Sequence, residues 1–372
     1  MASLFDPITI GPLTLNNRIV MAPMSRSRAG ADGVPTPLMA TYYAQRAGAG
    51  LIIGEGTQPS IAGRGYADTP GLHAAAQVQG WRRVTDAVHA AGGRIFAQLQ
   101  HVGRIGDPDA LPEGFELLAP SPVPAAGHIY ARDGKKKDFV TPREMTVADI
   151  VATAHEFAAA SRNAMEAGFD GVELHAGAGY LLHQFLATNA NRRTDAYGGS
   201  VESRIRFLCE VTETVARAIG ADRLGVRIYP GSTINDIHEN DTRALYTLLA
   251  HRLAPMRLAY LHVREMRDRE LTSHLRAAWP GLLILNARQT AEQASIASSA
   301  ARVIEDGVAD LVSFGRLFLA NPDLPRRLRA GGPFNQPDPA TFYGGGARGY
   351  TDYPTLDATL VATPDLLETE IA

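Results

Sequence analysis

The chain alternates between short apolar runs and longer segments whose apolar residues recur at helical spacing. The apolar runs predict eight strands: Ile19–Met24, Leu51–Glu55, Arg94–Leu99, Gly171–His175, Leu224–Tyr229, Ala259–Val263, Leu282–Leu285 and Leu311–Phe314. The alanine-rich segments between them predict helices: Leu38–Ala47, Val78–Ala91, Val147–Ala167, Val201–Ile219, Arg243–Leu253, a weaker one at Leu271–Trp279, and Ala291–Glu305. Strand and helix in eightfold repetition is typical of a parallel TIM (β/α)8 barrel. We therefore predict the α/β class, with residues 1–372 forming a single barrel domain.

Two segments lie outside this repeat. Leu4–Asn17 predicts a small hairpin that turns at Gly11 and Pro12 and closes the floor of the barrel. Residues 106–146, from Gly106 to Thr146, follow the third strand and contain six prolines. Long ordered loops at the ligand-binding rim are often functional, so we interpret this insertion as a cap or lid. The alternative is a passive surface excursion.

Composition narrows the functional classes. With 45% hydrophobic residues, 20% charged residues and a net charge of −3, the chain is globular and lacks the basic field of a nucleic-acid-binding protein. The run Lys135–Lys137 is interpreted as a solvated turn. No stretch approaches the ~20 apolar residues of a membrane span, and the start lacks an apolar signal core. The single cysteine, Cys209, cannot form an internal disulfide, which fits a buried thiol in a cytoplasmic protein. We expect a small-molecule substrate and a monomer or homodimer.

Polar residues gather where the strands end. The carboxyl ends of the predicted strands carry Ser25, Glu55, Gln98, His101, His175, Arg227, His262, Asn286 and Arg316. In a barrel these ends meet at one face, which is where barrel enzymes place their chemistry. His175 ends the fourth strand and Tyr180 opens an amphipathic segment, Leu181–Leu186, so the two are candidates for a catalytic donor pair. The alternative is a histidine that only satisfies a strand-end carbonyl. No residues have zinc-ligand spacing, so we predict no metal.

The last two strand ends suggest a phosphate site. Gly315 lets the backbone approach an anion, Arg316 can pair with it, and Ala287 and Arg288 offer further N–H groups. Arg227 lies within an apolar strand, where a guanidinium is costly unless it is paired or faces a negative ligand. Gln98 and Gln100 point to the same side of their strand, and their neutral amides suit a flavin edge or an uncharged substrate.

These residues occur within longer motifs that resemble the old yellow enzyme family of FMN-dependent ene-reductases. The motifs are Asn17–Arg26, Tyr42–Ala47, Gly80–Trp81, Gln98–Arg104, Ala167–Glu173, Arg192–Ser200, Asn321–Leu324 and Thr341–Gly344, and they follow one another in order over almost the whole chain. The resemblance implies a TIM barrel that binds FMN across its mouth and takes hydride from NADPH or NADH.

The resemblance also implies roles for particular residues. Pro23, Met24, Ser25, Gly56 and Gln98 would contact the flavin ring, Arg227 its N1 region, and Ala287, Arg288, Gly315 and Arg316 the phosphate. An α,β-unsaturated carbonyl compound would take hydride at Cβ while His175 holds its oxygen and Tyr180 protonates Cα. Gln100, Ala178, Tyr66 and Tyr343 would line the substrate side, with Phe342 beside them.

One position departs from the family pattern. The family's second oxyanion donor, an asparagine or histidine three residues after the first, is replaced by Ala178. Losing such a donor typically costs on the order of 100- to 1000-fold in rate. Gln100 also stands where the family has tryptophan, which makes the pocket more polar. Three hypotheses follow: an ene-reductase with altered substrate preference, a flavin-dependent isomerase or specialised biosynthetic reductase, or a flavin-binding protein with little turnover.

Overall fold

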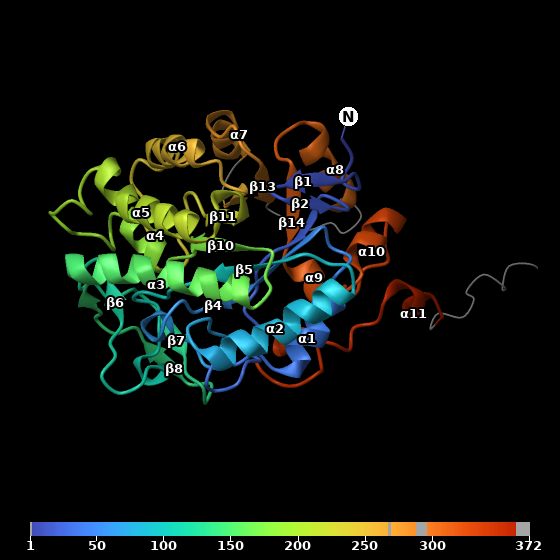
Figure 1. Cartoon of the computed structure of the whole chain (residues 1–372), viewed down its shortest axis with the longest axis horizontal. Coiled ribbons are helices and arrows are strands. Elements are labelled where there is room, and N and C mark those ends of the chain that lie inside the picture. The colour runs from blue at the N-terminus through green and yellow to red at the C-terminus, as the bar shows by residue number, and fades with distance from the viewer. Residues whose placement is uncertain (1, 267–268, 288–295, 362–372) are drawn as a thin grey trace, which may run out of the picture.

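The computed structural model describes residues 2–266, 269–287 and 296–361. At its centre is a closed parallel barrel of eight strands, as predicted (Figure 1). In barrel order along the chain these are β3 (Ile19–Met21), β4 (Leu51–Thr57), β5 (Ile95–Leu99), β10 (Gly171–Ala176), β11 (Leu224–Ile228), β12 (Tyr260–Arg264), β13 (Leu283–Asn286) and β14 (Leu311–Phe314). Pairing of β14 with β3 closes the ring, with Val312 opposite Ile19.

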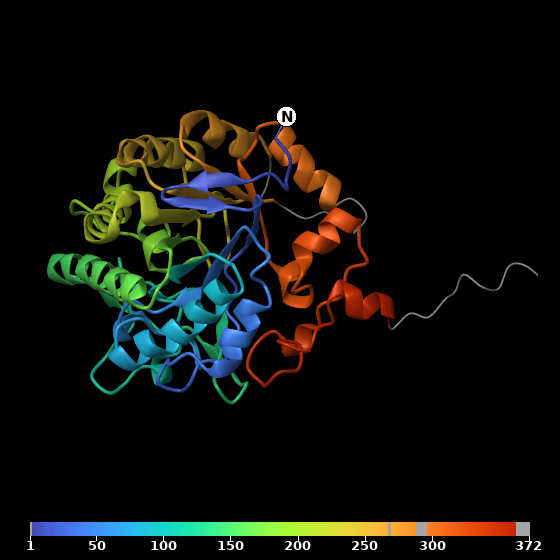
Figure 2. The same ribbon diagram turned by 45° about the vertical axis from the view of Figure 1, so that its right-hand side comes forward.

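Helices surround the barrel on its outer side (Figures 1 and 2). The α-helices of the described residues are α1 (Pro37–Ala44), α2 (Ala75–Ala90), α3 (Val147–Glu166), α4 (Leu181–Leu186), α5 (Val201–Ile219), α6 (Thr242–Leu253), α7 (Arg269–Ala278), α8 (Ile296–Glu305), α9 (Arg316–Ala320), α10 (Leu324–Ala330) and α11 (Leu356–Val361), the last of which lies apart from the barrel. Some helices begin at residues whose side chains cap the first turn. At α3, for example, the Thr146 side chain accepts from the backbone N–H of Asp149, whose carboxylate accepts in return from Thr146.

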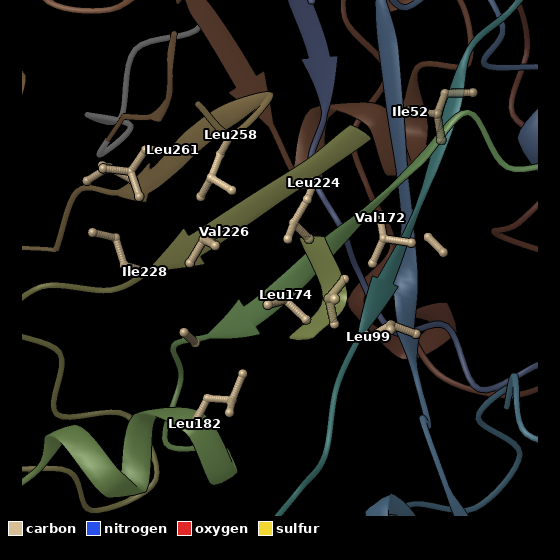
Figure 3. Close-up of a cluster of buried hydrophobic side chains, with 14 of the residues drawn as sticks. Ile52, Leu99, Val172, Leu174, Leu182, Leu224, Val226, Ile228, Leu258 and Leu261 are labelled. Carbon is tan, nitrogen blue, oxygen red and sulfur yellow. The ribbon is translucent and has the colours of Figure 1, made fainter. Parts of the chain in front are cut away.

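Alternation along each strand separates an outer apolar face from the barrel interior. Outward residues such as Val172, Leu174 and Val226 pack under the helices in one buried cluster (Figure 3). The inward residues near the strand starts form a second apolar cluster, which includes Phe96 and Tyr260. Two glycines make room for these rings. A Cβ on Gly171 would lie 2.4 Å from Phe96, and one on Gly225 would lie 2.3 Å from Tyr260.

The predicted N-terminal hairpin is present. Strands β1 (Ile8–Ile10) and β2 (Leu13–Leu15) pair antiparallel around a turn at Gly11, whose φ is +52°. Ile10 and Leu15 are buried in the same cluster as Phe96 and Tyr260. The hairpin therefore closes the floor of the barrel with apolar side chains.

The insertion after β5 contains the short strands β6 (Leu118–Ala119), β7 (His128–Tyr130), β8 (Lys136–Asp138) and β9 (Arg143–Glu144). Strands β7 and β8 form a hairpin, while β6 pairs with β9 in parallel. Leu111 and Leu117 pack with Val102, against which Tyr66 and Tyr180 also pack. The insertion thus supports one side of the barrel mouth.

The segment after α10 returns to the barrel and is held there by buried arginines. Arg26 donates to the carbonyl oxygens of Phe342 (2.9 Å) and Gly349 (3.0 Å), and the N–H of Gly344 donates back to the Arg26 carbonyl. The ring of Tyr350 stacks on Tyr42 with centroids 4.0 Å apart. The loop that follows β3 is therefore tied to the C-terminal segment.

Three local predictions need correction. The first barrel strand ends at Met21 rather than Met24, because residues 23–25 leave the sheet to line the mouth. Lys135–Lys137 is not wholly a turn, since Lys136 and Lys137 begin β8 and Lys137 pairs with Asp107 at 3.1 Å. Cys209 is free but only partly buried, and burial raises the pKa of its thiol to about 11.

Candidate active site

A layer of polar side chains crosses the barrel interior above the apolar floor. It comprises Gln98, Glu173, Arg227, His262, Asn286 and Ser313, all buried. Glu173 accepts from Nε2 of Gln98 and from Nδ1 of His262, each at 2.8 Å. Nε2 of His262 lies 2.8 Å from the Ser313 hydroxyl, and Asn286 donates to the Ser313 carbonyl at 2.8 Å. These contacts join five neighbouring or near-neighbouring strands in one network.

The charges in this layer are balanced inside the barrel. Burial works to raise the pKa of Glu173, but His262, Arg227 and the amide of Gln98 hold it below its usual value. Burial together with the Arg227 charge lowers the pKa of His262 to about 4. At neutral pH the layer therefore contains one carboxylate, one guanidinium and a neutral imidazole.

His175 lies directly above this layer at the end of β10. It is 6% exposed, and its Nδ1 has no partner among the described residues. Burial and the nearby Arg227 charge hold its pKa well below 6.5, so the imidazole is neutral at pH 7. A neutral imidazole carries one N–H group, which can donate a hydrogen bond to a ligand oxygen.

Tyr180 stands beside His175, with ring centroids 5.2 Å apart. Its hydroxyl lies 3.3 Å from that of Tyr66, so the two phenols share a hydrogen bond. Burial and the neighbouring Tyr66 raise the pKa of Tyr180 well above 10, and burial raises that of Tyr66 to about 12. Both phenols keep their protons at neutral pH, which is the state that a proton donor requires.

The loop between His175 and Tyr180 is fixed by side-chain hydrogen bonds. The Gly179 N–H donates to Nδ1 of His183 (3.0 Å), and Gln184 donates to the Gly179 carbonyl (2.7 Å). Nε2 of His183 donates to the Glu239 carboxylate at 2.8 Å, which also accepts from Tyr246. The helix α4 was predicted as amphipathic, but all six of its residues are buried. Its polar members serve this loop rather than solvent.

Ala178 adopts the left-handed conformation, with φ of +51°. Asn235 donates to its carbonyl oxygen at 2.7 Å. Asparagine and glycine tolerate this conformation better than alanine does, for which it is strained. The backbone at this position therefore has the shape that suits an asparagine, while the side chain provides only a methyl group.

The structure brings the predicted flavin-contacting residues to the same end of the barrel. Pro23, Met24 and Ser25 form the partly exposed loop after β3, and Gly56 pairs with Gln98 across β4 and β5. A Cβ on Gly56 would lie 2.3 Å from the end of the Gln100 side chain, which would have to move aside for a larger residue. Gln100 is buried at the mouth, as expected of a pocket wall.

The surroundings of Arg227 are compatible with an electron-rich cofactor. It is 2% exposed and forms no salt bridge within the described ranges 2–266, 269–287 and 296–361. Its partners are Asn286 (3.0 Å), the Tyr229 hydroxyl (3.3 Å) and His262 (2.9 Å), all neutral, with Glu173 one step further away. A buried cation held by neutral groups at a barrel mouth fits the pyrimidine edge of a flavin.

The predicted phosphate residues are only partly described. Gly315 begins α9, and a Cβ there would lie 3.5 Å from Met24, so packing does not demand a glycine. Arg316 is exposed and, within the part of the chain that the structure describes, has no side-chain partner. Ala287 follows β13 and is half-buried, whereas Arg288 lies outside the described residues. The small Gly315 and the exposed Arg316, which has no side-chain partner among the described residues, are compatible with an anion at this corner.

Tyr343 was predicted on the substrate side. Its side chain is 71% exposed, on the segment that Arg26 holds near the mouth. The phenol of Tyr343 lies close enough to Tyr66 and Tyr180 to contribute to the raised pKa of both. The structure therefore brings together His175, Tyr180, Tyr66 and Tyr343.

Three residues of this site were missed from the sequence. Glu173 was read only as part of a strand, although a carboxylate within an apolar run is itself a signal of a buried polar network. Ser313 gave no such signal. Tyr229 lies two residues after Arg227, so strand alternation places both on the same face. That spacing could have identified it.

Among the described residues, no group of three or more His, Cys, Asp or Glu side chains could hold a metal ion. No helix in the described ranges has the length and apolarity to cross a membrane.

A TIM barrel with a buried arginine and buried amides at its mouth is typical of a flavin-dependent barrel enzyme. Residues 3–335 match the model of the NADH:flavin oxidoreductase / NADH oxidase family, and the chain belongs to that family. It is an FMN-dependent oxidoreductase with a nicotinamide as hydride donor, as predicted from the sequence.

Relatives of known description cover nearly the whole chain. A protein described as "Probable flavin mononucleotide-dependent alkene reductase" of Leishmania infantum is 43% identical over 95% of this chain and 97% of its own length. Morphinone reductase in complex with tetrahydroNAD superposes with a TM-score of 0.91 at 43% identity, covering 96% and 99%. The old yellow enzyme homologue from Zymomonas mobilis superposes with a TM-score of 0.90 at 40% identity, covering 95% and 99%. The predicted resemblance to the old yellow enzymes is thus confirmed.

Proposed function

We propose that this protein reduces the activated C=C bond of α,β-unsaturated carbonyl compounds with hydride from NADPH or NADH. The supporting observation is the neutral His175 beside the protonated Tyr180 at the barrel mouth, 5.2 Å apart between ring centroids. Relatives described as alkene, morphinone and 12-oxophytodienoate reductases support the same reaction class.

Each residue has a proposed task. Bound FMN would supply the hydride-transfer chemistry that links the nicotinamide to Cβ of the alkene. Gln98 and Arg227 would hold the cofactor ring, and Pro23–Ser25, Ala287 and Gly315–Arg316 would complete its site. His175 donates to the carbonyl oxygen, on which negative charge develops, and Tyr180 gives its proton to Cα. Tyr66, hydrogen-bonded to Tyr180, keeps that phenol oriented.

The surroundings of the site suggest further roles. We propose that residues 106–146 cap the mouth, because Leu111 and Leu117 pack in the same cluster as Tyr66 and Tyr180. The single free cysteine agrees with a cytoplasmic location. A monomer or homodimer remains our expectation, and light scattering of the purified holoenzyme would measure it.

The test separates the two halves of the reaction. The FMN of the holoenzyme, mixed anaerobically with NADPH or NADH, should lose its visible absorbance, and 2-cyclohexenone should restore it. A Tyr180→Phe variant should keep the first step and slow the second by about 100-fold or more. A Tyr130→Phe variant on the exposed face of the cap should change neither.

Two results would contradict the proposal. One is failure of both nicotinamides to reduce the flavin, which would leave a flavin-binding protein. The other is product formation from an enone without nicotinamide consumption, which would identify an isomerase, the alternative that Ala178 motivates.

A further inference from the structure

Tyr229 occupies the wall of the mouth next to His175. It follows β11 directly and lies two residues beyond Arg227 on the same inward face. Its ring centroid is 5.5 Å from that of His175. The loop after β10 rests on this ring so closely that a Cβ on Gly177 would be 1.9 Å from its Cδ2. Tyr229 is thus in contact with the segment that carries His175 and Ala178.

The Tyr229 hydroxyl is held as an acceptor and remains free as a donor. Nε and Nη2 of Arg227 both donate to it, each at 3.3 Å. Within the described residues its own O–H has no acceptor, and the side chain is partly exposed to the mouth. A hydroxyl that accepts from a cation becomes a stronger donor through polarisation. The O–H group of Tyr229 can therefore donate a hydrogen bond to a ligand.

We propose that Tyr229 donates the second hydrogen bond to the substrate's carbonyl oxygen, opposite His175. The inference rests on the proposed ene-reductase function and deepens it. Ala178 supplies only a methyl group from the loop, so a second donor must come from another element. Strands β10 and β11 are neighbours in register, with His175 opposite Arg227, which places Tyr229 at the adjacent strand end.

The chemistry requires donors that hold their protons throughout. When Cβ gains hydride, the electrons of the C=C bond move onto the carbonyl oxygen as an enolate. Proton transfer from Tyr180 to Cα then restores the C=O bond. His175 and Tyr229 stabilise the oxygen without losing a proton. A phenol in place of a carboxamide would also make this side of the pocket bulkier and select for smaller or flatter carbonyl compounds.

The experiment uses a phenolate as a stable stand-in for the enolate. Oxidised holoenzyme is titrated with 4-hydroxybenzaldehyde at pH 7, and binding is followed by the flavin absorbance. Tyr229→Phe should weaken this binding by about 10- to 100-fold, as expected for one hydrogen bond to a charged oxygen, and kcat/KM for 2-cyclohexenone should fall in parallel. Tyr130→Phe is the matched control and should bind as the wild type does. FMN content and thermal melting establish that each variant is folded and loaded.

A second background shows whether Tyr229 replaces the donor missing at position 178. In an Ala178→Asn protein, Tyr229→Phe should weaken phenolate binding by less than about threefold, because the asparagine supplies a donor. Wild-type affinity in the single Tyr229→Phe variant would overturn the proposal. So would an equal loss in both backgrounds, or lost FMN affinity with unchanged phenolate affinity.

A His175→Ala variant distinguishes failure of the Tyr229 proposal from failure of the proposed ene-reductase function. If His175→Ala weakens phenolate binding and Tyr229→Phe does not, the oxyanion site stands and Tyr229 is not part of it. If neither variant changes the affinity, the oxyanion site itself is wrongly placed.

Discussion

The floor and the mouth of this barrel are built on the same eight strands but have opposite chemistry. At the floor, inward residues such as Phe96 and Tyr260 fill the interior with apolar groups, and Gly171 and Gly225 make room for them. One step of two residues further along β10 and β11, the inward positions become Glu173 and Arg227. In both strands, the inward positions thus change from apolar packing to polar side chains over two residues.

The barrel separates the residues that stabilise it from the residues that bind a ligand. Apolar side chains at the floor need only complementary shapes to pack. Each charged group of the polar layer instead needs a hydrogen-bond or charge partner on another strand. The layer satisfies Glu173 through Gln98 and His262 but leaves Arg227 with neutral partners and His175 with an unpartnered nitrogen. Arg227 and His175 lie toward the barrel mouth, where a ligand can complete their interactions.

The largest effect should come from breaking the floor. Gly225→Ala should lower the free energy of unfolding by about 3 kcal/mol, because its Cβ would meet the buried Tyr260 ring at 2.3 Å. Gly48→Ala is the matched control, since a Cβ there has no neighbour within 4 Å. Urea denaturation of both variants measures the difference. Equal stabilities would show that the floor is not closely packed.

The second prediction contrasts a buried glutamate outside the polar layer with the one inside it. Glu55 accepts from the Arg26 N–H and from Tyr43, and burial raises its pKa from 4.5 to about 6. Its contribution to stability is thus fully present below pH 4.5 and is lost as the pH rises through about 6. Glu173, with its lowered pKa, contributes in the opposite sense, and its contribution is lost as the pH falls.

Glu55→Gln should therefore remove a fall in stability of about 1.5 kcal/mol between pH 4.5 and 6.5. Denaturant unfolding of wild type and variant across this range measures it, since the other titrating groups cancel in the difference. A constant difference across the range would contradict the predicted direction.

The third prediction concerns the loop that separates His175 from Tyr180. His183→Phe removes the acceptor for the Gly179 N–H and should slow alkene reduction by about tenfold, while flavin reduction by NADPH stays near the wild-type rate. His183→Gln keeps a side-chain acceptor and should recover part of the loss. Rapid mixing measures both steps. Equal slowing of both would indicate general damage instead of misplacement of Tyr180.

The smallest effect is expected at Ala178. Ala178→Gly should relieve its left-handed conformation and raise the free energy of unfolding by up to about 1 kcal/mol, partly offset by the greater freedom of glycine in the unfolded chain. Ala187→Gly, at a buried residue with extended φ and ψ, is the control and should destabilise the protein. Chemical denaturation at pH 7 distinguishes the two signs.

Much of the architecture could be predicted from the chain alone. The alternation of apolar runs with helical segments located all eight strands, and the hairpin at Gly11 followed from its turn residues. Strand ends also pointed to His175, Gln98 and Arg227, because barrel strands expose their carboxyl ends at one face. The resemblance to the old yellow enzymes added roles and drew attention to Ala178.

What the sequence could not provide were partners from distant elements. Glu173 and His262 are 89 positions apart along the chain, and only closure of the barrel makes them a pair. The same holds for Tyr229, whose spacing from Arg227 is visible in the sequence but whose contact with Gly177 is not. Local pattern determined the elements because periodicity is a property of neighbouring residues. The tertiary structure decided which side chains lie against the loop that carries Ala178, because that depends on how separate strands meet.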